Sequence, residues 1–241
     1  KFDVVIHLAA IVGGRATIEG NPLAVAADLA IDADLFQWAL RTRPGHLVYF
    51  SSSAAYPIFL QRLEYKQKLK ESDINLDHIR TPDMTYGWAK LSGEKLASYA
   101  RAEGLSISIL RPFSGYGSDQ SLDYPFPSFI KRGKEKQAPF DVWGKGTQVR
   151  DFIHIEDVIR ATFEAITNKI EISNLCSGRP TSFIDLAELV MMQAGYLAEI
   201  RTNPTAPVGV AYRVGDTRKM LSFYQPRISL EEGIDRAFKG I

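Results

Sequence analysis

The chain has 241 residues, of which 45% are hydrophobic and 24% are charged, as in ordinary globular proteins. Its 29 basic and 28 acidic residues leave a net charge of +1, which argues against a nucleic acid or an anionic membrane as a partner. The single cysteine, Cys176, excludes an internal disulfide and favours a reducing cytoplasm, and no apolar run approaches the ~20 residues of a membrane span.

The first predicted strand covers residues 2–8, a nearly continuous apolar run of the kind that is buried on both faces of a parallel sheet. It ends in Ala9 and Ala10, whose small side chains would let a ligand approach the backbone. A helix is predicted over residues 22–43. It starts with a proline, as first helical turns often do, and the breaker pair Pro44-Gly45 follows it.

The next predicted strand, residues 46–50, runs directly into Ser51, Ser52 and Ser53. Ligands of parallel α/β sheets bind at the carboxyl ends of the strands. These three hydroxyls are therefore candidates for a binding site.

A tyrosine and a lysine, Tyr86 and Lys90, lie four residues apart at the start of a helix predicted over residues 86–102. Side chains at this spacing share one face of a helix. A nearby ammonium group lowers the pKa of a tyrosine, so Tyr86 could act as an acid or a base near neutral pH. Glu94 could instead pair with Lys90, and Thr85 is a candidate N-cap of the helix.

Two more strands are predicted over residues 105–112 and 170–176, with a region rich in proline and aromatic residues, 118–146, between them. Asp157 is expected to be a structural carboxylate near a helix N-terminus. Another helix is predicted to begin at Ser182. The sequence predicts no metal site.

The serine-tipped strand followed by Tyr86-Gly87-Trp88-Ala89-Lys90 resembles the extended short-chain dehydrogenase/reductase family, which comprises sugar-nucleotide epimerases, dehydratases and reductases. The resemblance covers nearly the whole chain. It implies an α/β fold, a doubly wound parallel sheet of the Rossmann type with a smaller substrate-binding lobe. The family's glycine-rich loop precedes such a first strand, and the sequence contains no G-x-G-x-x-G. We therefore expect roughly 60 further residues upstream, about two βα steps.

The resemblance also implies a division into domains and an assembly. The dinucleotide-binding domain is expected to comprise residues 1–112 and 149–176, and the sugar-nucleotide lobe residues 113–148 and 177–241. Relatives usually dimerise through the helices that correspond to residues 22–43 and 86–102, so a homodimer is expected.

The same resemblance assigns roles to individual residues. Tyr86 would transfer a proton, Lys90 would assist it and bind the nicotinamide ribose, and Ser52 would hydrogen-bond the reacting oxygen. NAD is the expected cofactor, with NADP possible, and a nucleotide-diphosphate sugar is the expected substrate. The residues expected to contact the cofactor are Leu8, Ala9, Ala10, Ser51, Tyr86, Lys90 and Pro112. Those expected to contact the substrate are Ser53, Ser114, Arg150 and Arg213.

The residues that follow Ser52 reduce the number of reactions that the chain could catalyse. Dehydratases of the family resemble one another in carrying carboxyl groups there, whereas this chain has Ser53 and Ala54. The segment is most similar to those of GDP-mannose 3,5-epimerase and GDP-fucose synthase, yet both have a cysteine where this chain has Ala54. We therefore expect an NAD-dependent epimerase that acts at C4 through a transient 4-keto sugar. An NADPH-dependent 4-ketoreductase is the alternative, and a non-catalytic dinucleotide-binding module is an alternative of another class.

Overall fold

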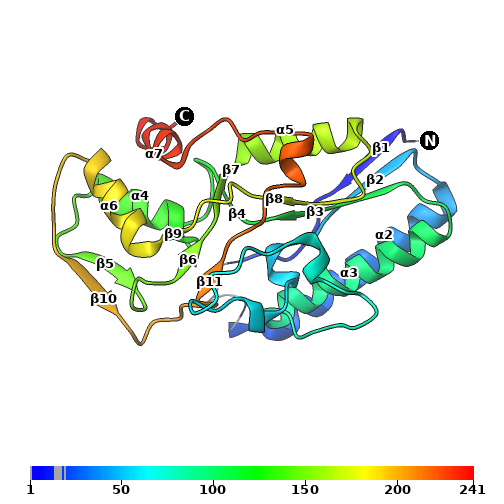
Figure 1. Cartoon of the computed structure of the whole chain (residues 1–241), viewed down its shortest axis with the longest axis horizontal. Coiled ribbons are helices and arrows are strands. Elements are labelled where there is room, and N and C mark those ends of the chain that lie inside the picture. Colours follow the sequence, from blue (N-terminus) through cyan, green and yellow to red (C-terminus); the bar gives the residue numbers. More distant parts are fainter. Residues whose placement is uncertain (1, 14–17, 19) are drawn as a thin grey trace.

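A parallel four-stranded sheet forms the centre of the computed structural model, which describes residues 2–13, 18 and 20–241 (Figure 1). The strands lie in the order β1 (Val4–His7), β2 (His46–Phe50), β3 (Ile107–Pro112) and β8 (Ile172–Leu175). Every neighbouring pair is parallel. The four apolar runs that predicted strands form this sheet, which confirms the predicted fold class.

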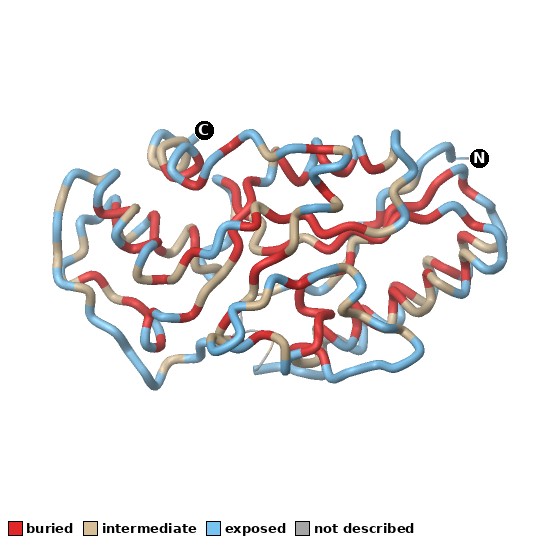
Figure 2. Tube along the Cα trace, in the orientation of Figure 1, coloured by how far each residue is buried: buried red, intermediate tan, exposed pale blue. Residues whose placement is uncertain are grey.

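Helices cover both faces of the sheet. Helices α2 (Val25–Thr42) and α3 (Met84–Ala102) lie on one face, and α5 (Ile155–Thr167) lies on the other (Figure 1). Successive side chains of a strand point to opposite faces, so Leu47 and Tyr49 of β2 pack under α2 and α3, whereas Val48 packs under α5. Figure 2 shows β2, β3 and β8 buried between these layers. The expectation that the first strand is buried on both faces was wrong, because β1 lies at the edge of the described sheet, and Val4 and Ile6 are 41% and 37% exposed.

The connection from α2 to β2 follows the predicted break. Helix α2 ends at Thr42, and Arg43 adopts a left-handed φ of 49° while its N–H donates to the Ala39 carbonyl over 2.8 Å. A Cβ atom at Gly45 would lie 2.5 Å from the Asp3 carbonyl oxygen. A glycine is therefore needed where the chain turns against the first strand.

The start of α3 differs from the prediction. The helix begins at Met84, with Asp83 at the N-cap position and no side-chain cap. Thr85 lies inside the first turn, and its hydroxyl oxygen is buried with no hydrogen-bond partner among the described residues. The expectation that Thr85 caps the helix was wrong, because the helix starts at Met84, two residues before the predicted start at Tyr86.

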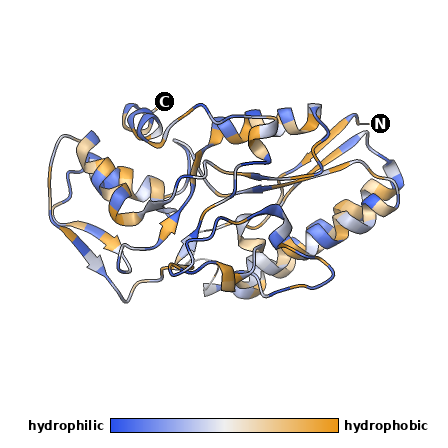
Figure 3. Ribbon diagram, in the orientation of Figure 1, coloured by the Kyte–Doolittle hydropathy of each residue, from blue (hydrophilic) through white to orange (hydrophobic). Residues whose placement is uncertain are grey.

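A second lobe is built from short strands and three helices around its own apolar core (Figures 1 and 3). Ser182 caps α6 (Phe183–Gln193), and it shares a capping box with Asp185, as expected of a helix that begins there. The strands are β4 (Ser114–Tyr116) beside β7 (Phe152–His154), β5 (Phe140–Trp143) beside β10 (Ile200–Asn203), and β6 (Val149–Arg150) between β11 (Tyr212–Arg213) and β9 (Thr181–Ser182). The helices are α4 (Pro125–Lys134), α6 (Phe183–Gln193) and α7 (Leu230–Lys239). Five 3-10 turns connect the larger elements: η1 (Pro22–Ala24), η2 (Ser53–Ala55), η3 (Ile58–Leu60), η4 (Glu71–Asp73) and η5 (Met220–Ser222).

The two lobes interleave along the chain. Phe152, assigned by prediction to the cofactor domain, packs in the apolar core of the second lobe. Phe113, assigned to that lobe, packs with Tyr56 and Cys176 beside the sheet. The predicted domain limits stay a prediction.

Asp157 in the first turn of α5 has a structural role, as predicted. Its carboxylate is fully buried and accepts three hydrogen bonds, from the Tyr224 hydroxyl at 2.5 Å and from the Arg227 and Ile228 amides at 3.0 Å each. It thereby fixes the segment that leads into α7.

Within the described part of the chain, none of the helices combines the length and the apolar character needed to cross a bilayer.

Candidate active site

The serines after β2 lie at the carboxyl edge of the parallel sheet, where the sequence places them. Ser52 is the N-cap of η2, and its hydroxyl accepts a hydrogen bond from the Ala54 amide at 3.1 Å. Ser52 is half-buried, whereas Ser51 and Ser53 on either side are buried. Of the three hydroxyls, that of Ser52 is therefore the most accessible to a ligand.

The fold brings the three predicted catalytic residues together. Lys90 is 3% exposed, and its Nζ atom lies 5.7 Å from the centroid of the Tyr86 ring. The side chain of Ser52 lies close enough to Tyr86 to lower its pKa. A serine, a tyrosine and a lysine from two separate elements thus form one cluster at the edge of the sheet.

The electrostatics of this cluster differ from the expectation for Tyr86. Burial raises the pKa of Tyr86 above its usual value, and the nearby carboxylates of Asp28 and Asp32 raise it further. The interaction with the Ser52 side chain lowers the Tyr86 pKa, but by less. Burial also lowers the pKa of Lys90, against the opposing effect of the same carboxylates. The expected decrease in the Tyr86 pKa is therefore wrong for the protein as described, because burial and acidic neighbours outweigh the lysine.

The buried lysine should reduce the stability of the fold. A lysine whose pKa is lower in the folded state is disfavoured there in its charged form, so stability increases as pH rises from the folded pKa towards the unfolded pKa. We expect Lys90→Met to raise the free energy of unfolding by on the order of 1 kcal/mol at neutral pH, with a gain that shrinks as pH approaches ~10.4. Urea unfolding at several pH values measures this.

Lys95 of the same helix provides the control. Its Nζ atom lies 3.3 Å from the exposed Asp77 carboxylate, so Lys95→Met should change stability by less than about 0.5 kcal/mol. A Lys90→Met variant less stable than the wild type at neutral pH would contradict the assignment of a cost to the Lys90 charge.

Two acidic residues beside Lys90 were not found by sequence reasoning. Asp28 and Asp32 lie one turn apart on α2 and are both 1% exposed. Asp32 accepts hydrogen bonds from the Tyr49 hydroxyl at 2.5 Å and joins the His7 ring at 3.0 Å, and burial raises the pKa of Asp28. The available signal was the spacing of two acids, four residues apart and therefore on one face of a helix.

Glu94 does not pair with Lys90. Its two carboxylate oxygens accept hydrogen bonds from Arg111 at 2.8 and 2.7 Å. This leaves the Lys90 ammonium beside Tyr86 rather than bound to the next turn of its own helix. The alternative role considered for Lys90, a partner for Glu94, is excluded.

The predicted cofactor contacts lie along the ends of the strands. Leu8 and Ala9 are exposed and Ala10 is half-buried after β1, whose His7 is paired in register with Tyr49 of β2. Exposed residues with small side chains after a strand of the sheet suit a bound dinucleotide, and the sequence contains no G-x-G-x-x-G turn for its pyrophosphate. Pro112 is the half-buried last residue of β3.

Ser51 uses its side chain elsewhere. It is buried, and its hydroxyl donates to the Glu94 carboxylate over 2.5 Å. A contact between Ser51 and the cofactor would therefore use the backbone, and this contact stays a prediction.

The two arginines predicted to hold the substrate lie on adjacent strands. Arg213 of β11 is the register partner of Arg150 of β6, although 62 residues separate them. The Arg150 guanidinium donates to backbone carbonyls, including that of Val210 at 2.8 Å, and Arg213 forms an ion pair with Asp83 at 2.6 Å. Guanidinium groups suit the oxygens of a diphosphate, and the contact of either arginine with the substrate stays a prediction.

The two predicted substrate serines lie in different surroundings. Ser53 is buried within η2, and Ser114 is a half-buried residue of β4 whose amide donates to the Asp151 carbonyl over 2.9 Å. Their contacts with substrate stay predictions.

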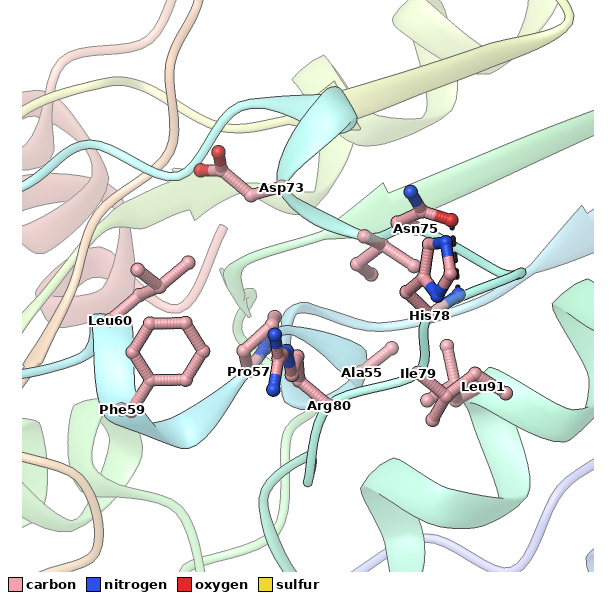
Figure 4. Close-up of a pocket in the computed structure, with 11 residues that line it drawn as sticks. Ala55, Pro57, Phe59, Leu60, Asp73, Asn75, His78, Ile79, Arg80 and Leu91 are labelled. Carbon is pink, nitrogen blue, oxygen red and sulfur yellow. Dashed lines mark hydrogen bonds between the residues drawn. The ribbon is translucent and has the colours of Figure 1, made fainter.

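A separate pocket of about 310 Å³ lies between η2, the first half of α3 and the loop after η4 (Figure 4). None of the proposed catalytic residues lines it. Its described lining consists of Ala55, Pro57, Phe59, Leu60, Asp73, Ile74, Asn75, His78, Ile79, Arg80 and Leu91. The chemistry of the cluster around Tyr86 therefore belongs to a different surface of the molecule.

A parallel sheet whose carboxyl edge carries a serine, a tyrosine and a lysine in one cluster defines a dinucleotide-dependent class of α/β enzymes. The model of the NAD dependent epimerase/dehydratase family matches residues 1–176, and the chain belongs to this family. It is 32% identical over 241 residues to a UDP-glucuronate 4-epimerase of Thermodesulfobacterium geofontis, covering 98% of this chain and 71% of the relative. It is 25% identical over 252 residues to a GDP-L-fucose synthase of Sinorhizobium fredii, covering 99% of this chain and 79% of that one.

Solved structures agree with the sequence comparisons. The crystal structure of UDP-glucuronic acid 4-epimerase from Bacillus cereus, in complex with UDP-glucuronic acid and NAD, superposes with a TM-score of 0.83 at 27% identity, covering 99% of this chain and 74% of that one. The predictions of an enzyme of nucleotide-sugar metabolism and of an NAD-dependent family are confirmed.

Proposed function

We propose that the protein is an epimerase that uses NAD to invert C4 of a nucleotide-diphosphate sugar. The observation that carries this proposal is the cluster in which Tyr86 lies beside the buried Lys90 and close enough to Ser52 for that side chain to lower its pKa. The similarity to the UDP-glucuronate 4-epimerase of T. geofontis supports the choice of C4.

The proposed roles follow from the chemistry of each group. Bound NAD⁺ supplies reversible oxidation at C4, and its positive charge favours the phenolate form of a nearby tyrosine. Tyr86 accepts the proton of the C4 hydroxyl and later returns it to the same oxygen. Ser52 donates a hydrogen bond to that oxygen, and Lys90 holds a positive charge beneath the phenolate.

The residue after the serines favours this reaction over its neighbours in the family. Ala54 is buried in η2 and carries no group that could remove a proton from carbon. With neither a thiol nor a carboxyl group at this position, proton transfer is limited to the hydroxyl chemistry of Tyr86. Inversion at C4 through a ketone needs no other acid or base.

A ketoreductase remains the second candidate because a relative supports it. The chain is 27% identical over 227 residues to a dTDP-4-dehydro-6-deoxy-D-allose reductase of a Streptomyces species. The test is to incubate the full-length protein with UDP-glucuronic acid and UDP-glucose, the sugar nucleotides of the related enzymes, and to follow the nicotinamide absorbance. An epimerase forms product with no net change in NADH. A reductase leaves both sugar nucleotides unchanged, since neither carries a ketone at C4, and consumes NADPH only when it is given a 4-keto sugar nucleotide.

The third candidate, a non-catalytic dinucleotide-binding module, has no need of a buried lysine beside an acidic pair. It would be favoured only if the full-length protein bound NAD and turned over no sugar nucleotide.

Arg150 and Arg213 are proposed to hold the substrate diphosphate. We expect Arg150→Met to raise the KM for the sugar nucleotide by ~10- to 100-fold with a smaller change in kcat, since hydrogen bonds to charged groups contribute about 1.5–3 kcal/mol. Steady-state kinetics measure this. Arg201→Met removes an exposed arginine that pairs with Asp141 on the second lobe, and it should leave KM unchanged. A fall in kcat at constant KM in Arg150→Met would refute the binding role.

The proposal includes a homodimer in the cytoplasm. Leu29 of α2 and Trp88 and Tyr99 of α3 are large apolar side chains that are 42%, 44% and 59% exposed. Such side chains on adjacent helices suit a partner subunit. Light scattering of the wild type and of Trp88→Glu tests this, and a wild type that is monomeric at micromolar concentration would exclude it.

A further inference from the structure

One ion pair holds both ends of the short segment that carries Ser52. At the front end, the Ser51 hydroxyl donates to Glu94 Oε1 over 2.5 Å. At the far end, the Tyr56 hydroxyl accepts from Arg111 Nη1 at 3.0 Å. Residues 51–56, with η2 between the two contacts, are therefore attached at each end to Glu94 or Arg111.

The pair itself is deeply buried and bidentate. Glu94 is 0% exposed and Arg111 is 1% exposed. Arg111 Nε and Nη2 donate to the two Glu94 oxygens over 2.8 and 2.7 Å. Such geometry restricts the relative position of the two side chains more than a single contact does.

The position of Glu94 connects this pair to the proposed catalytic residues. Glu94 lies one helical turn after Lys90 and two turns after Tyr86 on α3. Its partner Arg111 lies near the end of β3, and Arg111 Nη1 also donates to the Glu71 carbonyl over 2.9 Å. The ion pair thus links the helix of Tyr86 with the segment of Ser52.

We propose that Glu94 and Arg111 position the Ser52 hydroxyl against Tyr86, with Ser51 and Tyr56 as the two attachment points. This inference rests on the proposed function. Glu94, Arg111, Ser51 and Tyr56 are positioning residues, because the proposed contact with the substrate is made by the Ser52 side chain and not by theirs. A buried ion pair is costly to desolvate and is weak evidence for stability, whereas a serine that must meet a reacting oxygen has to be held within ~0.5 Å.

The cleanest test removes one hydroxyl at a time and leaves the ion pair in place. We expect Ser51→Ala and Tyr56→Phe each to lower kcat about tenfold with KM changed less than twofold, since a ~1 Å misplacement can cost ~10²-fold. In each variant the interaction of the Ser52 side chain with Tyr86 should weaken. That interaction lowers the pKa of Tyr86 in the free protein, so the pH at which kcat/KM is half-maximal should shift upward.

Two variants serve as matched controls for the loss of a buried hydroxyl. Ser108→Ala removes a hydroxyl of β3 that bonds His46 at 2.9 Å, and Tyr224→Phe removes one that bonds Asp157. Both should lower the melting temperature and leave kcat and the pH profile of kcat/KM unchanged.

A crystal structure of Ser51→Ala in the full-length protein distinguishes a failure of the positioning role from a failure of the proposed function. We expect the distance between the Ser52 and Tyr86 oxygens to increase by about 0.5 Å or more. An unchanged distance, or an unchanged kcat in both Ser51→Ala and Tyr56→Phe, would overturn the positioning role. A wild type without turnover on any sugar nucleotide would overturn the proposed function, and the crystallographic result would still decide the inference.

Discussion

Tyr86→Phe should lower kcat for the sugar nucleotide by about 10²- to 10⁴-fold, the range that a general acid–base group contributes. The substitution removes one oxygen and keeps the ring that lies 5.7 Å from Lys90 Nζ. Without the phenol, the cluster loses the group that is proposed to take the C4 hydroxyl proton. Initial rates measured with saturating substrate give the effect.

Tyr99→Phe is the control on the same helix. Tyr99 is 59% exposed, so this variant should keep full activity in the full-length protein. The melting temperature of Tyr86→Phe should remain within a few degrees of the wild type. If Tyr86→Phe retained more than about a tenth of the wild-type kcat, the catalytic assignment would be refuted.

The largest effect on stability is expected for Asp157→Ala. The substitution leaves two backbone amides and the Tyr224 hydroxyl without the carboxylate that they bond at 2.5–3.0 Å. Each buried group that loses its partner costs about 1–3 kcal/mol. We therefore expect the free energy of unfolding to fall by about 3 kcal/mol or more, measured by urea unfolding.

Glu156→Ala provides the comparison for Asp157→Ala. Glu156 precedes Asp157 in the same helical turn, and its exposed carboxylate pairs with Arg160 at 2.9 Å and with Arg236 at 3.0 Å. Exposed pairs of this kind contribute ~0–1 kcal/mol. A similar loss of stability in both variants would mean that charge near the helix N-terminus, and not the buried network, is responsible.

The sequence predicts the sheet and the main helices well because their signals are local. Strand β2 has the predicted bounds, residues 46–50, since an apolar run ends there in three serines. Helix α2 ends at Thr42, beside the breaker pair Pro44-Gly45. The apolar spacing of α3 was equally readable, and only its first residues were misplaced.

The candidate site was predicted only in part because its electrostatics depend on contacts between distant segments. The spacing of Glu94 and Lys90 suggests a pair, yet the partner of Glu94 is Arg111, 17 residues away on a strand. The pKa of Tyr86 was expected to fall because Lys90 was the one visible charge. Burial and the carboxylates of α2 reverse its direction, and neither can be read from local spacing.

The most direct test of the account follows the hydrogen at C4. The full-length protein would be given UDP-glucuronic acid or UDP-glucose with deuterium at C4, and the product would be analysed by mass spectrometry and NMR. We predict a C4 epimer that keeps its deuterium at C4, with no net formation of NADH. A product that had lost the deuterium, or no C4 epimer from either sugar nucleotide, would contradict epimerisation through oxidation and reduction at a single carbon.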